Sequence, residues 1–154
     1  MKEKEILLIF NKYKKQNIRL LGDHALYDGE IEKRCIELFG NKFQGVYSQD
    51  SIFAHKPGYY IFNTDLKSGS GIHWLGAVLC RKNAYLYDSF GRDLNKVVPI
   101  LIKNLSKKYT VKFDTKDAEQ KKMYKNEITK SCGAACIAFL QCVDKYGIVN
   151  AMKI

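Results

Sequence analysis

The stretch HWLGAVLC-RKN-AYLYDS, residues 73–89, contains two runs rich in apolar and aromatic residues with a short polar segment between them. Runs of this kind, separated by a few polar residues, are typical of an antiparallel β-hairpin. The sequence therefore predicts one strand over residues 73–80 and its partner over residues 84–89, connected by residues 81–83. A β-sheet that contains this hairpin is the first expectation for the fold.

The register of the hairpin follows from the length of its connection. If Leu79 pairs with Ala84 across a four-residue loop, Asp88 lies opposite Leu75. Residues two apart along a strand share a face, so His73 and Asp88 become diagonal neighbours about 7 Å apart. The sequence thus predicts that a carboxylate reaches an imidazole across the two strands. The alternative is an ordinary polar pair on an exposed sheet edge.

The rest of the chain shows helical and extended patterns. Periodicity predicts helices over residues 3–16, 29–39, 94–105 and 132–146, and further strands over residues 59–62 and 110–113. Asp28 and Asp93 are expected to cap the second and third helices, while Gly147 suits the end of the fourth. The polar residues 114–130 indicate a loop or a frayed short helix. Together these elements predict an α+β fold, with a small mixed β-sheet flanked by helices.

Composition limits the class of protein. A length of 154 residues predicts one domain over residues 1–154, and 46% hydrophobic with 12% aromatic residues is typical of a globular chain. No apolar run approaches the roughly 18 residues that a membrane span needs. Acidic residues within the first five positions argue against a signal peptide. The chain is therefore expected to be soluble and not secreted.

Five cysteines occupy positions 35, 80, 132, 136 and 142. They form no CxxC pair and no Cys/His cluster at zinc spacing, so no metal is expected. An odd number leaves at least one thiol unpaired, which fits a reducing, intracellular compartment. Cys35, Cys80, Cys136 and Cys142 are expected to be small core residues. His24 and His55 are expected to be structural or surface residues.

The formal net charge of +10 comes mostly from lysine. Dispersed lysine is compatible both with simple solubility and with a surface for nucleic acid, because a polyanion is the natural partner of such a field. The scarcity of arginine argues against base-specific recognition. Non-specific duplex DNA is therefore a candidate partner, and a possible activator.

His73, Asp88 and Cys132 together supply a base, a group that orients it and a nucleophile, the three parts of an activated cysteine. Cys132 lies where a helix is predicted to begin, with Ser131 or Thr129 as possible cap, and the positive end of the helix dipole favours the thiolate. Gly133 is unfavourable inside a helix and makes sense where backbone approaches a substrate. The sequence therefore predicts a cysteine protease.

Four segments resemble the adenovirus-type maturation proteases, the adenain family, whose fold is shared with the SUMO and ubiquitin-like protein proteases. They are Phe62-Asn63-Thr64, Gly71-Ile72-His73-Trp74-Leu75, Tyr85-Leu86-Tyr87-Asp88-Ser89-Phe90-Gly91 and Ser131-Cys132-Gly133-Ala134-Ala135-Cys136. The resemblance covers residues 45–145 in consistent order. Among relatives, the chain looks most like the compact versions of virophages and Maverick/Polinton elements.

The resemblance implies roles for further residues. In relatives the tryptophan of the His-Trp pair roofs a channel that admits glycine, which implies substrate binding by Trp74 and cleavage at Gly-containing sites. An oxyanion hole needs preset donors. The Cys132 backbone N–H is expected to be one, because first-turn amides lack an intrahelical partner. Relatives add a glutamine six or seven residues before the cysteine; here Asn126 is the expected donor, with Gln120 as the fallback.

The resemblance also implies the biological role. The expected function is a viral maturation endopeptidase that cleaves capsid or other virion precursor polypeptides as a monomer, in the virion and at viral assembly sites. A deconjugating peptidase that acts on ubiquitin-like tails has the same fold and triad and stays open as an alternative. The alternative from another class is a basic DNA-binding packaging protein without catalytic activity.

Overall fold

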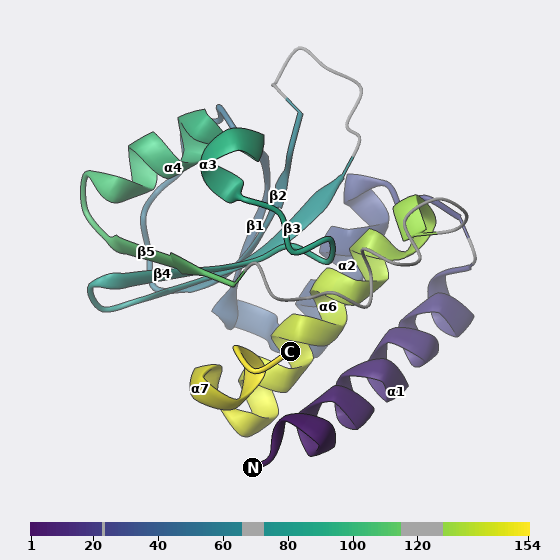
Figure 1. Ribbon diagram of the computed structural model, residues 1–154. Coiled ribbons are helices and arrows are strands. Elements are labelled where there is room, and N and C mark those ends of the chain that lie inside the picture. Colours follow the sequence, from purple (N-terminus) through teal and green to yellow (C-terminus); the bar gives the residue numbers. More distant parts are fainter. Residues whose placement is uncertain (23, 66–72, 115–127) are drawn as a thin grey trace.

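A five-stranded mixed β-sheet forms the centre of the computed structural model, which describes the chain apart from residues 23, 66–72 and 115–127 (Figure 1). The strands lie side by side in chain order: β1 (Phe43–Ser48), β2 (Gly58–Asn63), β3 (Trp74–Cys80), β4 (Asn83–Tyr87) and β5 (Thr110–Phe113). β2, β3 and β4 pair antiparallel, whereas β1 and β5 run parallel to their neighbours. The prediction of a mixed sheet in an α+β fold is confirmed.

The predicted hairpin is formed by β3 and β4. Leu79 pairs with Ala84, and the ladder extends to the pair Gly76 and Tyr87, so the predicted register is confirmed. His73 directly precedes β3 and Asp88 directly follows β4. Because the two strands are antiparallel, these two residues leave the sheet at the same end of the hairpin.

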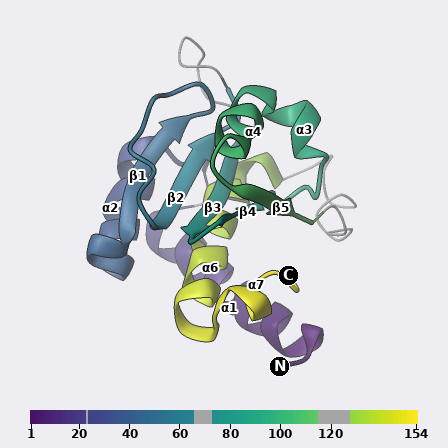
Figure 2. The same cartoon turned by 90° about the vertical axis from the view of Figure 1, so that its left-hand side faces the viewer.

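Helices cover both faces of the sheet (Figure 2). One face carries α1 (Glu3–Leu21), α2 (Asp28–Phe39), α6 (Ile128–Tyr146) and the short α7 (Ile148–Ala151); the other carries α3 (Leu94–Val97) and α4 (Pro99–Ser106). Alternate side chains of each strand point to opposite layers. Ile61 and Val78 pack toward α6, whereas Phe62 and Leu75 pack toward α4. The two cores together enclose the sheet.

Helix α6 is the most deeply buried helix next to the sheet, and it packs between β3 and α1. A Cβ at Gly76 of β3 would lie 3.3 Å from the Phe139 ring, so the missing side chain lets the helix come close to the strand. On the opposite side of α6, the buried Asn17 of α1 donates to the Gln141 side chain at 2.8 Å. The position of α6 relative to the sheet is therefore held from both sides.

Several element boundaries differ from the sequence predictions. α1 continues to Leu21, and a turn of 3₁₀ helix, η1 (Gly40–Lys42), follows α2. Asp28 is the first residue of α2 rather than its cap; Tyr27 precedes the helix, and the Glu30 carboxylate accepts from its N–H at 3.0 Å. The structure also adds β1 and α7 to the predicted elements.

The predicted helix over residues 94–105 is divided into α3 and α4. Pro99 is the first residue of α4, where its missing N–H costs nothing, but its ring disfavours a helical conformation at Val98. Asp93 does cap α3, since its carboxylate accepts from the Asn95 N–H at 3.1 Å. The prediction for residues 114–130 is wrong at its end, because α6 already begins at Ile128.

Candidate active site

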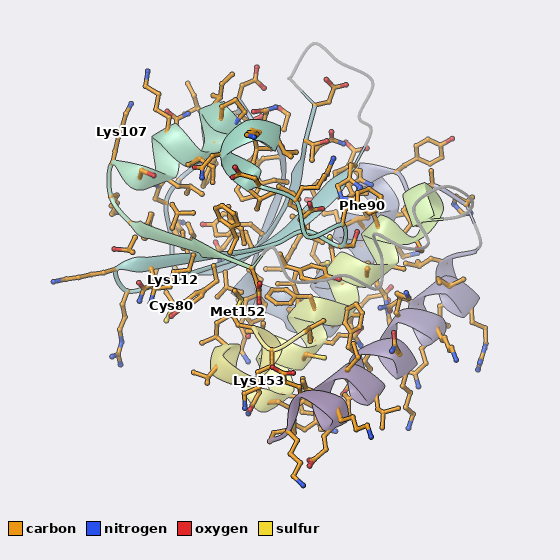
Figure 3. The ribbon with its side chains drawn as sticks, viewed as in Figure 1. Cys80, Phe90, Lys107, Lys112, Met152 and Lys153 are labelled. Carbon is orange, nitrogen blue, oxygen red and sulfur yellow. The ribbon has the colours of Figure 1, made fainter. Side chains whose placement is uncertain are left out.

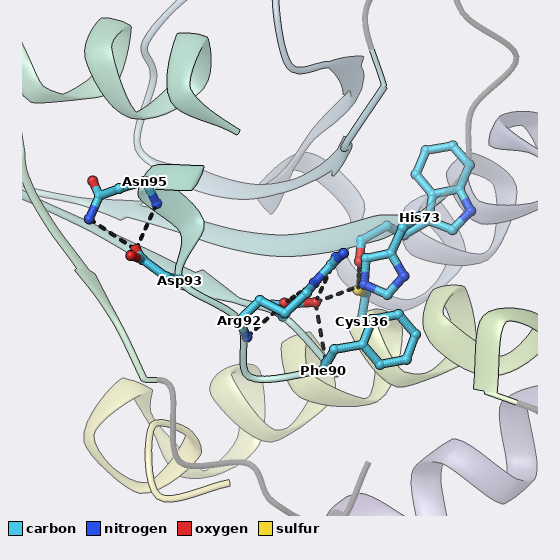
Figure 4. Close-up of polar contacts among 8 residues, drawn as sticks. His73, Phe90, Arg92, Asp93, Asn95 and Cys136 are labelled. Carbon is cyan, nitrogen blue, oxygen red and sulfur yellow. Dashed lines mark hydrogen bonds and ion pairs between the residues drawn. The ribbon is translucent and has the colours of Figure 1, made fainter. Parts of the chain in front are cut away.

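The imidazole of His73 and the carboxylate of Asp88 meet at the end of the β3–β4 hairpin (Figure 4). His73 Nε2 lies 2.7 Å from Asp88 Oδ1, and the two residues are 3% and 4% exposed. The His73 backbone is held as well, because its carbonyl oxygen accepts from the Thr64 N–H at 2.9 Å. The pair is therefore buried at the end of two central strands, and is not an exposed polar pair on a sheet edge.

The turn after β4 holds the Asp88 carboxylate with several donors. Backbone N–H groups of Phe90 and Arg92 donate to Oδ1 at 3.2 Å and Oδ2 at 3.0 Å, and Arg92 Nε donates to Oδ2 at 2.9 Å. The turn closes where the Gly91 N–H donates to the Asp88 carbonyl oxygen at 2.9 Å, and Gly91 adopts a φ of 58° that favours glycine. Burial raises the pKa of Asp88, but hydrogen bonds from His73 and Arg92 outweigh it and hold the pKa well below its usual value.

The His73 ring is fixed on its face as well as at its edge. The Phe90 ring stacks on it with centroids 4.3 Å apart and planes 20° apart. Burial lowers the pKa of His73, but the hydrogen bond with Asp88 and the neighbouring Cys132 thiol outweigh it, so the pKa lies above its usual value. Nδ1 is buried without a hydrogen-bond partner among the described residues. With Nε2 bound to Asp88, Nδ1 is the nitrogen available to the thiol.

The structure brings Cys132 to this pair from α6, but not from the start of the helix. α6 begins at Ile128, so Cys132 lies in its second turn and is 3% exposed. The expectation that the first turn places the Cys132 thiol at the end of the helix dipole is therefore wrong. The premise for its backbone N–H as an oxyanion donor is wrong for the same reason, because only the first four amides of a helix lack an intrahelical acceptor.

Trp74 and Gly133 both contact the segment before α2. Trp74 is half-buried, and its indole Nε1 donates to the Leu26 carbonyl oxygen at 3.1 Å. A Cβ at Gly133 would lie 3.1 Å from the Leu26 side chain and 3.3 Å from that of Ile31. Gly133 thus allows α6 to approach α2. The roles of Trp74 and Gly133 in substrate binding stay predictions.

The proposed side-chain donors of the oxyanion hole, Asn126 and Gln120, lie outside the described residues. Their roles stay predictions.

The other cysteines differ in their surroundings, and none of the five forms a disulfide in the described chain. Cys136 is fully buried one turn after Cys132, its thiol donates to the Trp74 carbonyl oxygen at 3.3 Å, and burial raises its pKa well above the usual value. Cys35 and Cys142 are buried as predicted. Cys80 is exposed at the end of β3, so the expectation of a core residue is wrong there.

The two remaining histidines have surface or structural surroundings, as predicted. His24 is exposed and its Nε2 lies 3.0 Å from a Glu30 carboxylate oxygen. The His55 ring stacks between the rings of Phe53 and Tyr109, with centroids 4.7 Å and 5.8 Å away.

Two residues of the site received no role from the sequence: Arg92, which binds Asp88, and Leu26, which binds Trp74. A signal for Arg92 was present, because an arginine four residues after an aspartate and just past a glycine turn can fold back onto the carboxylate. Leu26 carries no such signal, since it acts through its backbone carbonyl group and lies 48 residues from Trp74.

Within the described residues, no group of three or more His, Cys, Asp and Glu side chains gathers as metal ligands would. In the same part of the chain, no helix combines the length and apolar character needed to cross a membrane. The chain matches no known protein family model, and no curated protein matches it. The geometry of the site itself therefore carries the functional argument.

Proposed function

We propose that this protein is a cysteine endopeptidase in which Cys132 is the nucleophile, His73 the base and Asp88 the group that orients the base. The observation that carries the proposal is the different bonding of the two ring nitrogens of His73. Nε2 lies 2.7 Å from Asp88 Oδ1, the buried Nδ1 has no hydrogen-bond partner among the described residues, and the neighbouring Cys132 thiol helps to raise the pKa of His73.

The bonding supports a catalytic role more than a structural one. A buried polar atom without a partner costs about 1–3 kcal/mol, so a purely structural His73 would be expected to use both ring nitrogens. A base that exchanges a proton with a thiol needs one nitrogen facing the sulfur and the other held by an orienting group. The bond between Nε2 and Asp88 supplies the orienting group, and the unbonded Nδ1 on a ring that neighbours Cys132 is compatible with the other condition.

The chemistry follows from these positions. The thiolate of Cys132 attacks the carbonyl carbon of a peptide bond while His73 carries the proton. The imidazolium then gives this proton to the leaving amine, and a thioester to Cys132 remains. Water gives a proton to neutral His73 while its hydroxide adds to the thioester carbon. The carbon–sulfur bond then breaks, which releases the carboxylic acid and restores the Cys132 thiolate beside the His73 imidazolium. Asp88 holds the ring and stabilises its charged form throughout.

The substrate proposal rests on the family resemblance and on burial. His73 and Cys132 are each 3% exposed, so a chain that reaches them must be narrow at the scissile bond. Glycine is the residue that fits such an approach, in agreement with the role implied for Trp74. We therefore extend the proposal to adenain-like cleavage of virion precursor polypeptides at Gly-containing sites. A deconjugating peptidase for ubiquitin-like tails uses the same chemistry and the same glycine preference.

The first prediction tests the nucleophile. Cys132→Ala is expected to remove cleavage of a fluorogenic Gly-containing peptide without unfolding the chain, because no other group forms the acyl-enzyme. Cys142→Ala is the matched control: it removes a buried thiol from the same helix, and its activity is expected to stay near that of the wild-type protein. Peptide cleavage by purified Cys132→Ala at the wild-type rate would refute the assignment.

A ubiquitin- or SUMO-based fluorogenic substrate cleaved faster than the peptide would favour the deconjugating alternative.

A further inference from the structure

Arg92 makes the strongest contact to the triad that the proposed mechanism leaves unused. Its Nε donates to Asp88 Oδ2 at 2.9 Å, and a terminal guanidinium nitrogen donates to Oδ1 at 3.4 Å. Oδ1 is the same oxygen that lies 2.7 Å from His73 Nε2. The Asp88 side chain is 1% exposed and that of Arg92 is 34% exposed. One buried carboxylate is therefore shared between the imidazole and a guanidinium that reaches solvent (Figure 4).

The guanidinium is not needed to orient this carboxylate. Two backbone N–H groups of the same turn, from Phe90 and Arg92, already bind one carboxylate oxygen each, at 3.2 Å and 3.0 Å. Both donors would remain if the side chain of Arg92 were replaced. The distinctive contribution of that side chain is its charge, which arginine keeps at every accessible pH.

The proposed reaction creates a need for that charge. His73 is positively charged while it holds the thiol proton, and neutral after it has passed the proton to the leaving amine. In the neutral state Asp88 would be a buried carboxylate without a counter-ion, which is costly. Arg92 supplies a permanent counter-ion in both states. Because the Arg92 guanidinium binds the same carboxylate, it also weakens the attraction between Asp88 and the imidazolium.

Phe90 links the two cations. Its ring stacks on His73, and the Arg92 guanidinium carbon lies 5.0 Å from the centre of the Phe90 ring. The other titratable groups next to the imidazole in the described structure are Asp88 and the thiol of Cys132 from α6. Cys136, one turn along α6, is held neutral by burial. Arg92 is thus the permanent positive charge of this site in the described chain.

We propose that Arg92 is a positioning residue of the triad that acts through the charge of Asp88: it balances the carboxylate so that His73 can release its proton to the leaving group. This inference rests on the peptidase function proposed above. It predicts that removal of the Arg92 charge makes His73 hold its proton more tightly, whereas removal of a merely structural support would loosen Asp88 and have the opposite effect.

The test is an NMR titration of the His73 ring in a Cys132→Ala background, where no thiol exchanges a proton with it. Arg92→Met and Arg92→Gln are expected to raise the titration midpoint of His73 by about one pH unit, the size expected when one nearby charge is removed at partial burial. Arg92→Lys keeps the charge and is expected to stay near the parent protein. Arg19→Met, which removes an exposed arginine of α1, is the matched control, and His24 and His55 are internal references.

A midpoint that stays unchanged or falls in folded Arg92→Gln would overturn the proposal; this variant keeps a hydrogen-bond donor and decides the question if Arg92→Met does not fold. With Cys132 present, the high-pH limb of kcat/KM is expected to move upward with the same variants. If the wild-type protein cleaves no peptide, the proposed function fails, but the titration still shows whether the charge of Arg92 weakens the binding of the proton by His73.

Discussion

At the scale of single residues, the site depends on the hydrogen-bond donors that surround the carboxylate of Asp88. Asp88 is almost completely buried, yet its carboxylate accepts hydrogen bonds from an imidazole, a guanidinium and two backbone N–H groups. These bonds favour the charged form, so the pKa of Asp88 is lowered on folding in spite of its burial. A group with a lowered pKa stabilises the fold at pH values above its unfolded pKa, and this contribution disappears as the pH falls toward the folded pKa.

The residue-scale prediction concerns Asp88→Asn. At pH 7 we expect a loss of about 3 kcal/mol in the free energy of unfolding, because one partner of a buried pair is removed. The difference from the wild-type protein is expected to shrink by about 1 kcal/mol at pH 3, where a carboxyl with an ordinary pKa is already mostly protonated in the unfolded chain. Urea denaturation at both pH values measures this.

Asp28→Asn serves as the control for the Asp88 prediction, because Asp28 is exposed at the start of α2. It is expected to change the stability little at either pH. A difference for Asp88→Asn that is the same at pH 7 and pH 3 would contradict the proposed origin of its stabilisation. Catalysis by Asp88→Asn is expected to fall below the wild-type rate but to stay above that of Cys132→Ala, since the amide still holds the ring.

At the scale of elements, Cys132 lies beside His73 because α6 packs closely against β3. The contact is close: the Phe139 ring fills the space beside Gly76, and the Cys136 thiol donates to the Trp74 carbonyl oxygen. Cys132 lies one turn before Cys136 on the same helix, so the distance between α6 and β3 sets the distance between thiol and imidazole. Packing at Gly76 should therefore control activity as well as stability.

The element-scale prediction is that Gly76→Val destabilises the protein by about 1–3 kcal/mol, the usual cost of extra volume in a packed core. It is also expected to lower kcat, because the added side chain pushes α6 away from β3. Gly29→Ala is the matched control: nothing lies within 4 Å of the added Cβ, and the substitution is expected to stabilise α2 by up to about 1 kcal/mol. Full activity of Gly76→Val would contradict the prediction, because it would show that catalysis does not depend on the packing of α6 against β3.

At the scale of the whole molecule, the net charge of +10 favours binding of a polyanion. Five basic residues, which we call the hairpin cluster, lie at the β3–β4 turn and on or next to β5: Arg81, Lys82, Lys107, Lys108 and Lys112. The Thr110 N–H donates to the Lys82 carbonyl oxygen at 2.7 Å, which joins the two segments. Figure 3 shows Lys107 and Lys112 at this end of the sheet, with Cys80 nearby. This end of the sheet is the surface where we propose that duplex DNA binds.

The whole-molecule prediction is that the protein binds duplex DNA of any sequence. The logarithm of the binding constant is expected to fall linearly with the logarithm of the salt concentration. Replacing Lys82, Lys108 and Lys112 by glutamine is expected to lower the affinity and reduce the salt slope by up to about three, roughly one for each lysine that no longer neutralises a phosphate. The matched control replaces Lys4, Lys12 and Lys15 of α1, which removes the same charge elsewhere. Fluorescence anisotropy of a labelled random duplex measures both; equal effects of the two triple variants would exclude a local site.

The hairpin, its register and the approach of Asp88 to His73 could be predicted from the sequence alone, because an antiparallel hairpin is local: the pairing of Leu79 with Ala84 follows from a short connection and from strand alternation. Cys132 was predicted from its residue type and the helix expected to follow it, and the role of Trp74 from the family resemblance. Element ends were harder, since the start of α6 depends on packing as well as on the cap residues that the sequence offers.

Three contacts of the site follow from tertiary packing alone: His73 meets Asp88 through Nε2, Arg92 shares the carboxylate, and Leu26 fills the space beside Gly133. Tertiary packing also decided that β1 and β5 join the sheet in parallel, at its two edges. Such contacts join residues far apart in the chain, as the bond between Cys136 and Trp74 does across 62 positions. Local preference carries no information about them, because they form only when burial of apolar surface brings the layers together.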